Sequence, residues 1–355
     1  MKLLLCHPGA SWAVADVHKG VADALERAGV EVVQYALDGR ISYWQLWFKW
    51  LWKRNKRQGV ELPTYSESDI LFAASQDIVL KALHHKVDWV LVIAGTYVHP
   101  EGLAMLRRAG IRLAVILTES PYSDIQEIGI TRLANVVWTN ERASVPIFSQ
   151  YGECHYWQHA MDPERHGTEA TGADDAVPAH DVVFVGTGFE ERIAALEAVD
   201  WTGIDFGLYG SWTLLGSRHP LRKHLRAGVI DNRATAALYR KAKIGLNLHR
   251  TSVGWGRNVE HIKLVAESMN PRCYELAACG RFFVSDYRAE VAEVFGGLVP
   301  TFSTPTELEA LIRRYLADDE ARMNIAERLP ACVAEHTFDN RITNLLAVLN
   351  GERNM

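Results

Sequence analysis

Short apolar runs alternate along the chain with longer segments in which apolar residues recur every three or four positions. The short runs end at Gly, Pro, Asn or Asp, as strands do before a turn, and the longer segments have the period of one-sided helices. Because the two kinds of segment follow one another, the pattern predicts βα units and a parallel sheet. In the first half we predict strands at 3–6, 30–35, 89–94, 113–117 and 136–139, and helices at 16–28, 69–84 and 101–109.

The alternation stops at residues 166–178, where Val177 is the one large apolar side chain, and this segment is predicted to be a linker. The rhythm then resumes, which indicates a second α/β domain. Its predicted strands are 182–185, 206–209, 244–248 and 282–285, and its predicted helices are 305–316 and 338–349. We therefore expect an N-terminal domain over 1–165, a linker over 166–179, a C-terminal domain over 180–337 and a closing helix over 338–355.

Composition adds little to the predicted fold, but it indicates the cellular compartment. The net charge of -5 does not indicate a nucleic acid or an anionic membrane as a global partner. Five scattered cysteines with no metal spacing are typical of free thiols in a reducing cytosol. The chain shows no signal peptide and no apolar run of about 20 residues, so we expect a cytoplasmic protein without stable membrane insertion.

A glycine-rich turn follows the strand predicted at 182–185. Its residues Gly186, Thr187 and Gly188 allow backbone N–H groups to approach a diphosphate, with a helix N-terminus behind them. A tight βα turn without a ligand is the alternative. Position 191 is Glu where a dinucleotide fingerprint would have Gly, which counts against a dehydrogenase, and no Gly-Lys-Ser/Thr loop occurs.

The segment 267–280 predicts a helix that begins at Pro271 and stops at Gly280. At its N-terminus, Asn270 and Arg272 can donate to phosphate oxygens, and Glu275 can accept from ribose hydroxyls. A capped surface helix with a salt bridge is the alternative.

The segments 243–250, 270–280 and 283–286 together resemble group-1 GT-B glycosyltransferases, and most of all the CgeB-like branch. This resemblance implies two Rossmann-like domains that face a central cleft. It also implies that Glu275 binds the donor ribose and that Glu267, seven residues before it, lies near the sugar hydroxyls as a catalytic residue. Glu267 is followed by Ser-Met-Asn where relatives have Gly-Phe-Gly, so the stereochemical outcome stays open.

Cations and an aromatic residue complete the predicted donor site. Arg250, Arg257 and Lys263 can neutralise a leaving diphosphate, which matters because the resemblance implies a fold without a metal ion and no Asp-x-Asp motif occurs. Tyr209 follows a strand and can stack on the nucleobase, or it can pack in the core.

The first half offers candidates for the catalytic base. His7, Asp16 and His18 lie in or near the first βα turn. Gly9, in the same turn, is a candidate donor-binding residue because it can let the backbone approach the donor or the acceptor. Glu119 follows the strand predicted at 113–117, at the edge where α/β sheets bind ligands. Each of these residues has a structural role as its alternative.

Aromatic and basic residues interleave between Asp38 and Glu61, where no acidic residue occurs. An amphipathic helix that closes a core is one interpretation, a nucleic-acid surface is a second and a peripheral membrane contact is a third. The second would make the acceptor a hydroxymethylated pyrimidine in DNA, as in phage glycosyltransferases. Its residues would be Trp50, Lys53, Arg54, Lys56 and Arg57.

These observations predict a metal-independent glycosyltransferase of the hexosyltransferase class. It would move a sugar from a nucleoside diphosphate donor, with a UDP-sugar favoured, to an acceptor hydroxyl, and it would need no cofactor beyond that co-substrate. A sugar-nucleotide epimerase of the same fold, or a transferase acting on a protein, lipid or small molecule, is the alternative. The oligomeric state stays open.

Overall fold

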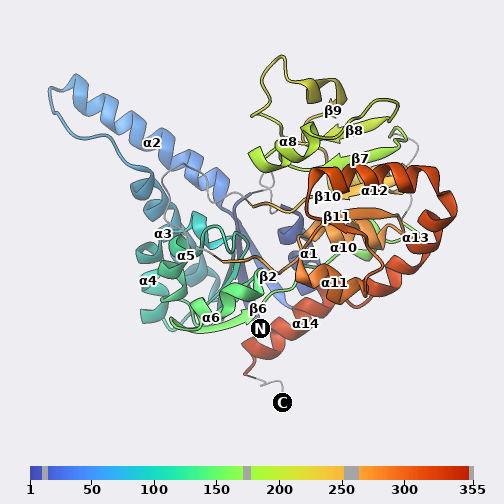
Figure 1. Cartoon of the computed structure of the whole chain (residues 1–355). Helices are drawn as coiled ribbons and strands as arrows, with labels where there is room; N and C mark the ends of the chain where they lie inside the picture. Colours follow the sequence, from blue (N-terminus) through green and yellow to red (C-terminus); the bar gives the residue numbers. More distant parts are fainter. Residues whose placement is uncertain (10–14, 171–176, 252–263, 352–355) are drawn as a thin grey trace. The chain divides into compact units, whose positions relative to one another are not determined.

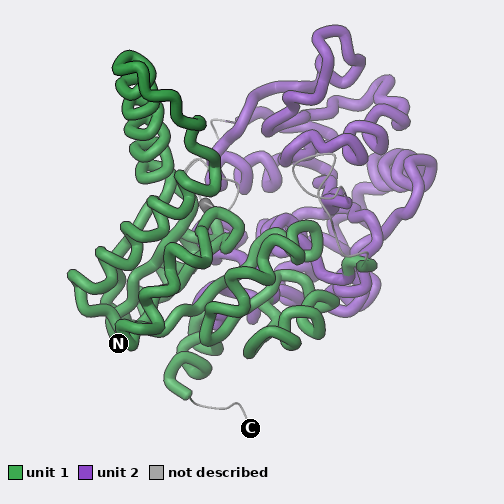
Figure 2. Tube along the Cα trace, turned by 90° about the vertical axis from the view of Figure 1, so that its left-hand side faces the viewer, with its two compact units in different colours: residues 1–157, 254–266, 342–355 green, residues 158–253, 267–341 purple. Residues whose placement is uncertain are grey.

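The computed structural model describes residues 1–9, 15–170, 177–251 and 264–351 (Figure 1). The chain divides into two compact units (Figure 2). Unit 1 comprises Met1–Trp157, Gly254–Ala266 and Ile342–Met355, and unit 2 comprises Gln158–Val253 and Glu267–Arg341. Of the predicted linker, residues 171–176 lie outside the described residues, and His166 ends a short helix.

Unit 1 contains a six-stranded sheet in which every described pair of strands is parallel. In spatial order its strands are β2 (Glu31–Ala36), β1 (Lys2–His7), β3 (Trp89–Ile93), β4 (Arg112–Leu117), β5 (Val136–Thr139) and β6 (Glu153–Tyr156). Its helices include α1 (Ala15–Arg27), α2 (Leu37–Arg57), α3 (Glu67–His85), α4 (Pro100–Arg108), α5 (Asp124–Thr131) and α6 (Val145–Phe148), with short helices η1 (Gly95–Tyr97) and η2 (Arg142–Ser144).

Unit 2 repeats this plan with a second parallel sheet. Its order is β12 (Thr301–Phe302), β11 (Phe283–Asp286), β10 (Ile244–Asn247), β7 (Val182–Val185), β8 (Phe206–Tyr209) and β9 (Leu225–Ala227). Its helices include α7 (Pro163–His166), α8 (Glu190–Glu197), α9 (Asn232–Lys241), α10 (Pro271–Ala278), α11 (Ala289–Phe295), α12 (Pro305–Ala317) and α13 (Asp319–Val333), with η4 (Pro220–His224). Helix α14 (Phe338–Leu349) belongs to unit 2 up to Arg341 and to unit 1 from Ile342.

The sheet of unit 2 is buried on both faces, as expected for parallel strands flanked by helices. Strand β7 shows why: Val183 and Val185 pack in one apolar cluster with α9, α10 and α13, while Val182 and Phe184 pack in another with α8 and α12. Continuous apolar runs are therefore the sequence signature of these strands. Unit 1 has its own core, to which β1, β3 and β4 contribute alternate residues.

The nine predicted strands all occur, each displaced by at most one residue at an end. The pattern missed β6, β9 and β12, because these edge strands are short and β6 carries the half-polar sequence Glu-Cys-His-Tyr. All five cysteines are free thiols, as predicted. In the described part of the chain, no helix combines the length and hydropathy needed to cross a bilayer.

Candidate functional site

The carboxyl ends of β11, β10, β7 and β8 adjoin one another in unit 2, because these four strands are neighbours in a parallel sheet. Polar residues follow three of them: Gly186–Gly188 after β7, His249 and Arg250 after β10, and Asp286 at the end of β11. Ligands of open α/β sheets bind at this edge. The sequence predictions for Gly186, Arg250 and the α10 region thus come together on one side of one sheet.

The glycine-rich turn is shaped mainly by close packing. A Cβ added at Gly188 would lie 2.3 Å from Cε3 of Trp212, so only glycine fits there. The amide of Gly186 donates to the carbonyl of Tyr209 at 3.1 Å, and that of Gly188 donates to Ser211 at 2.8 Å. The turn therefore offers fewer N–H donors to a diphosphate than predicted, because two of its three amides already have partners. Thr187 N–H donates to no described backbone or side-chain group.

Two arginines bring positive charge to this turn. The guanidinium of Arg192 donates to the carbonyls of Thr187, at 3.0 Å, and Leu248, at 2.7 Å, and so ties the ends of β7 and β10 together. It lies 5.1 Å from the ring centroid of Phe189, and the guanidinium of Arg250 lies 4.9 Å from the same ring. Arg192 was missed by the sequence analysis, since its partner Leu248 lies 56 residues away in sequence. Arg257 and Lys263 lie outside the described residues.

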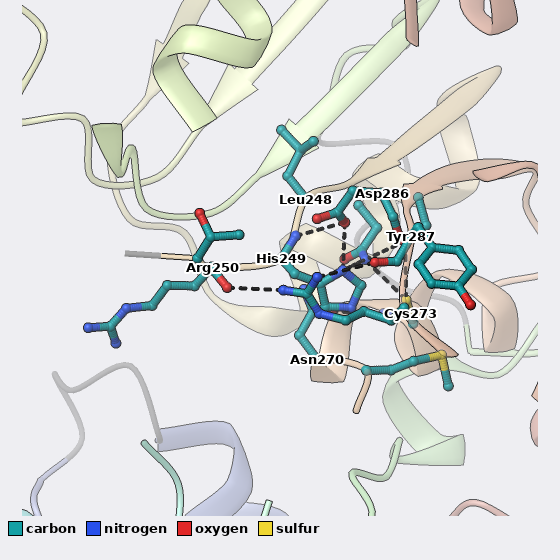
Figure 3. A network of polar contacts seen from close by, with 12 residues as sticks. Leu248, His249, Arg250, Asn270, Cys273, Asp286 and Tyr287 are labelled. Atoms are coloured by element: carbon teal, nitrogen blue, oxygen red, sulfur yellow. Dashed lines mark hydrogen bonds and ion pairs between the residues drawn. The ribbon is translucent and has the colours of Figure 1, made fainter. Parts of the chain in front are cut away.

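A buried histidine and aspartate pair joins the ends of β10 and β11 (Figure 3). Both the backbone N–H and Nδ1 of His249 bond to Oδ1 of Asp286. Burial raises the pKa of Asp286, but the charge and hydrogen bonds of His249 outweigh it, so the net shift is downward. Because an ionised Asp286 only accepts, Nδ1 of His249 carries the proton. Its Nε2 is buried and has no partner among the described residues.

The amide of Asn247 extends this network into α10. Its Nδ2 donates to Oγ of Ser285 at 2.9 Å and to Sγ of Cys273 at 3.1 Å. Figure 3 shows the Arg250 side chain directed away from the His249 and Asp286 pair, while its carbonyl accepts from Arg288 at 3.3 Å. The network therefore fixes the backbone from which Arg250 extends and leaves its guanidinium toward Phe189.

Helix α10 begins as the sequence predicts. Pro271 is its first residue, and the side chain of Asn270 accepts from the amide of Cys273 at 3.3 Å, which identifies Asn270 as the N-cap. Gly280, with φ of 61°, follows the helix end. A further residue supports the segment before α10: buried Glu290 accepts from the amide of Met269 at 2.6 Å and from Gln158 at 2.9 Å. Glu267 is partly exposed, and its carbonyl accepts from Glu290 N–H at 3.1 Å.

Glu275 lies inside unit 2 with only 4 % of its surface exposed. Its carboxylate pairs with the guanidinium of Arg272, which also donates to Oδ1 of Asn232 at 3.0 Å. Burial raises the pKa of Glu275. The lowering effects are larger: they are the nearby charges of Arg272 and His166 and hydrogen bonds from Arg272 and Asn232. The net shift is downward, so the carboxylate is ionised. Arg272 is thus already paired with Glu275, although its side chain is still 28 % exposed to solvent.

Tyr209 is placed in the core of unit 2. Its ring is 4 % exposed, and its hydroxyl bonds to Nε2 of His180 at 2.9 Å. Trp212, after it, is also buried and packs against Phe184. The structure thus shows the core packing that was the alternative for Tyr209, and a base could reach this residue only at its backbone.

In unit 1, the predicted residues near the end of β1 come together. The rings of His7 and His18 stack with centroids 3.4 Å apart, and His18 Nε2 bonds to Gln34 at 3.0 Å. Burial, with the charge of His18, lowers the pKa of His7 to about 4, and burial also lowers the pKa of His18. Both rings are therefore neutral at pH 7 and able to accept a proton.

Gly9 meets a residue that the sequence analysis did not single out. With φ of 135°, a Cβ at this position would lie 2.1 Å from Oδ2 of Asp38. Asp38, whose amide donates to Pro8 at 2.9 Å, lines a cavity of about 550 Å³ between α2, α3 and η1. Ser42, Gln45, Glu67 and Tyr97 supply the other polar lining. Asp16 lies in the first turn of α1, outside that lining.

Glu119 is partly exposed after β4, and a buried acidic group lies near it. Glu127 is fully buried, and neither carboxylate oxygen has a partner among the described residues. Burial, and then the charges of Glu119 and Asp124, raise its pKa well above the usual range. Asp124 accepts from Oγ of Ser144 at 2.6 Å, and burial raises its pKa as well.

Comparison with known proteins agrees with this architecture. Residues 191–347, which contain the α10 site and the ends of β10 and β11, match the family described as glycosyl transferase-like. Sucrose-phosphate synthase from Thermosynechococcus elongatus superposes with a TM-score of 0.67 at 12 % identity, over 99 % of this chain and 100 % of that one. The fold is GT-B. The predicted fold class is thus confirmed, since each GT-B unit here has its own six-stranded parallel sheet.

Other GT-B structures are equally distant in sequence. An E. coli structure named for trehalose-6-phosphate and bound with UDP-2-fluoro glucose has a TM-score of 0.63 and 12 % identity, with both chains covered completely. A Listeria monocytogenes protein named as a candidate UDP-N-acetylglucosamine 2-epimerase has a TM-score of 0.59 and 10 % identity, over 98 % and 96 % of the two chains. No curated protein matches the chain in sequence. At this identity the similarity establishes the fold.

Proposed function

We propose that this protein is a glycosyltransferase that takes a sugar from a nucleoside diphosphate donor bound to unit 2. The observation that carries the proposal is the buried, ionised Glu275 beside the N-terminus of α10, within the glycosyl transferase-like segment. An ionised carboxylate is a strong acceptor for two ribose hydroxyls. Arg272 pairs with this carboxylate and is itself held by a hydrogen bond to Oδ1 of Asn232. A UDP-sugar is the favoured donor, because a protein of the same fold binds UDP-2-fluoro glucose.

The diphosphate would be compensated by cations of this chain. The guanidiniums of Arg250 and Arg192 both lie near the ring of Phe189, which follows the glycine-rich turn, and Thr187 N–H adds a neutral donor. Fixed positive charge at the leaving group stabilises the transition state without reorganisation. Arg257 and Lys263 stay predicted contributors. We propose that no metal ion is required, and activity that is unchanged by EDTA is the expected result.

The proposed acceptor site is the cavity of unit 1 lined by Asp38, Ser42, Gln45, Glu67 and Tyr97. Hydroxyl donors of a polyol would bond to the carboxylates of Asp38 and Glu67. His7, which is neutral at pH 7, lies close enough to Asp38 for the negative charge of that carboxylate to act on its pKa. A hydroxymethylated pyrimidine in DNA stays a prediction for the acceptor. The carboxylates of Asp38 and Glu67 count against it in this cavity, since they would repel a polynucleotide backbone.

The donor site is tested by calorimetric titration of the purified chain with UDP and UDP-glucose. Changing Glu275 to Ala is expected to weaken UDP binding by ~1–3 kcal/mol, because the ribose loses its charged acceptor. The matched control is Glu327→Ala, an exposed glutamate of α13 that should leave binding unchanged. Equal UDP affinity in wild type and the Glu275 variant would refute the assignment.

The epimerase alternative is separated by its products. A transferase releases UDP from UDP-sugar only when a suitable acceptor is present, whereas an epimerase changes the sugar in the absence of an acceptor. The comparison is made by chromatography of the nucleotide sugar after incubation with and without a polyol mixture. An altered sugar without acceptor would assign epimerase activity.

A further inference from the structure

Helix α2 packs on α3 through only one of its faces. On that face, Nε1 of Trp44 donates to Oδ2 of Asp77 at 3.0 Å. Phe48 stacks on Tyr65, which precedes α3, with ring centroids 4.2 Å apart. This packing explains part of the aromatic content of the helix, since Trp44 also packs against the core of unit 1. It leaves the opposite face unaccounted for.

Large apolar side chains also occupy that opposite face. Tyr43, Leu46, Trp47 and Trp50 are 50 %, 70 %, 42 % and 49 % exposed. Their spacing of three, four and seven positions places them in a single stripe along the helix. Contiguous exposed apolar groups on a water-facing helix are uncommon in proteins without a partner for them.

The same stripe becomes basic toward the C-terminal end of α2. Lys53, Arg54 and Arg57 follow Tyr43 at ten, eleven and fourteen positions, which keeps them on the exposed face. No acidic residue occurs between Asp38 and Glu61 to offset them. Figures 1 and 2 show α2 running out beyond the rest of unit 1, with its basic end outermost.

We propose that the exposed face of α2 docks on an anionic lipid surface. Tyr and Trp side chains favour the boundary between headgroups and acyl chains, and basic residues at one end of the helix meet anionic headgroups. The helix would lie in the plane of the interface, with Leu46 and the two tryptophans entering it. This surface is separate from the donor site of unit 2, so its docking does not depend on the proposed reaction.

The arrangement favours lipid over nucleic acid for two reasons. The rings of Trp47 and Trp50 stack on each other at 5.0 Å, and the guanidinium of Arg54 lies 5.7 Å from Trp50, so their faces are partly occupied and less open to bases. The cations also gather at one end of the stripe, and Leu46, the most exposed of its four apolar side chains, has no ring to stack. An apolar stretch with a charged end is typical of an interfacial helix.

The test is co-sedimentation of the full chain with vesicles of phosphatidylcholine, alone or mixed with phosphatidylglycerol. We expect binding to the mixed vesicles that weakens in 1 M salt, since screening removes the attraction of the headgroups. Changing Trp47 and Trp50 to Ser should weaken binding by at least about tenfold. Changing Lys53 and Arg54 to Ser should weaken it by about 25-fold, because each cation contributes about fivefold at ~1 kcal/mol.

The matched control removes two exposed cations elsewhere, Arg314→Ser with Arg328→Ser, and should bind vesicles like the wild type. Because all substituted side chains are exposed or partly exposed, circular dichroism is expected to show an unchanged fold. Absence of binding to mixed vesicles would overturn the proposal. The proposal would also be overturned if fluorescence anisotropy showed that the α2 variants lose binding to a DNA oligonucleotide while they keep binding to the vesicles. Sedimentation equilibrium showing a dimer that the Trp47 and Trp50 changes dissolve would assign the face to a second copy.

Discussion

Two buried glutamates, one in each unit, are placed alike and behave oppositely. Glu127 lies in the first turn of α5, and Glu275 lies one turn into α10; both helices are short and belong to units built on a parallel sheet. Glu275 has Arg272 and Asn232 as partners, and its pKa is lowered. Glu127 has no described partner, and its pKa is raised well above the usual range. Burial acts on both, and the presence of a cation decides which carboxyl is charged.

This contrast in charge suits the carboxyl edges of the two sheets to different roles. The edge of unit 2 keeps a fixed negative group among fixed positive ones, which suits recognition of a ribose and a diphosphate. Around Glu127, unit 1 keeps a carboxyl sealed from solvent, with a pKa raised well above the usual range by burial and by the charges of Glu119 and Asp124. The site proposal for unit 1 therefore depends on the cavity at Asp38, whose lining is open, and not on the Glu127 cluster.

Removing the cation from unit 2 should produce the largest effect. With Arg272→Met, Glu275 becomes a buried charge without its main partner, as Glu127 would be if ionised. We expect a loss of ~3 kcal/mol in the free energy of unfolding at pH 7, measured by urea denaturation. The loss should shrink as the pH falls, since Glu275 then takes up a proton. A loss that is equal at pH 7 and pH 4.5 would show that Arg272 acts through packing alone.

The second pair of unit 2 tests the same principle at the sheet edge. Asp286→Asn removes the charge that His249 stabilises and leaves Nδ1 with a weaker acceptor, so we expect a loss of ~2 kcal/mol at pH 7. Because the pKa of Asp286 is lowered on folding, its stabilisation is present above the pKa of the unfolded chain and is lost as the pH falls. The difference between wild type and variant in urea denaturation should therefore shrink as the pH falls below the ordinary pKa of an aspartate, about 4. Parallel curves would contradict this.

A substitution that makes position 127 permanently neutral should increase the free energy of unfolding, in contrast to the two changes in unit 2. Its folded pKa is raised, so the wild type loses stability as the pH rises from the unfolded value toward the folded one. Glu127→Gln is expected to gain at least about 1 kcal/mol at high pH and little near pH 4. Thermal unfolding at pH 4, 7 and 9 measures the difference. The exposed Glu327→Gln serves as control, and a gain independent of pH would refute the role of ionisation.

The smallest effect is expected at Asp124, which sharpens the comparison within unit 1. Ser144→Ala removes a buried hydrogen bond to its carboxylate, so the pKa of Asp124 should rise further, at a cost of ~1 kcal/mol. NMR titration of the carboxyl carbon measures the shift. A pKa that stays unchanged would show that burial alone sets it.

Much of the candidate site followed from local rules. The start at Pro271 and the stop at Gly280 are read from neighbouring residues, and the structure has both, with Asn270 as the N-cap that the sequence analysis had named only as a phosphate donor. Arg192, His249 and Asp286 were missed, because the contacts that join the strand ends, Arg192 with Leu248 and His249 with Asp286, span 56 and 37 residues of sequence. One signal was available: His249 and Asp286 both follow predicted strands, where side chains at the same sheet edge converge.

The sequence by itself determined the βα rhythm, the strands with continuous apolar runs and the ends of α10, because these depend on residues close together in the chain. Only the tertiary structure decided which charges meet. It placed Arg272 and Asn232 near Glu275 and left the buried carboxyl of Glu127 without a described partner, and it buried Tyr209 while exposing Trp47 and Trp50. Electrostatic and burial effects depend on distances between segments far apart in sequence, and a local pattern does not contain those distances.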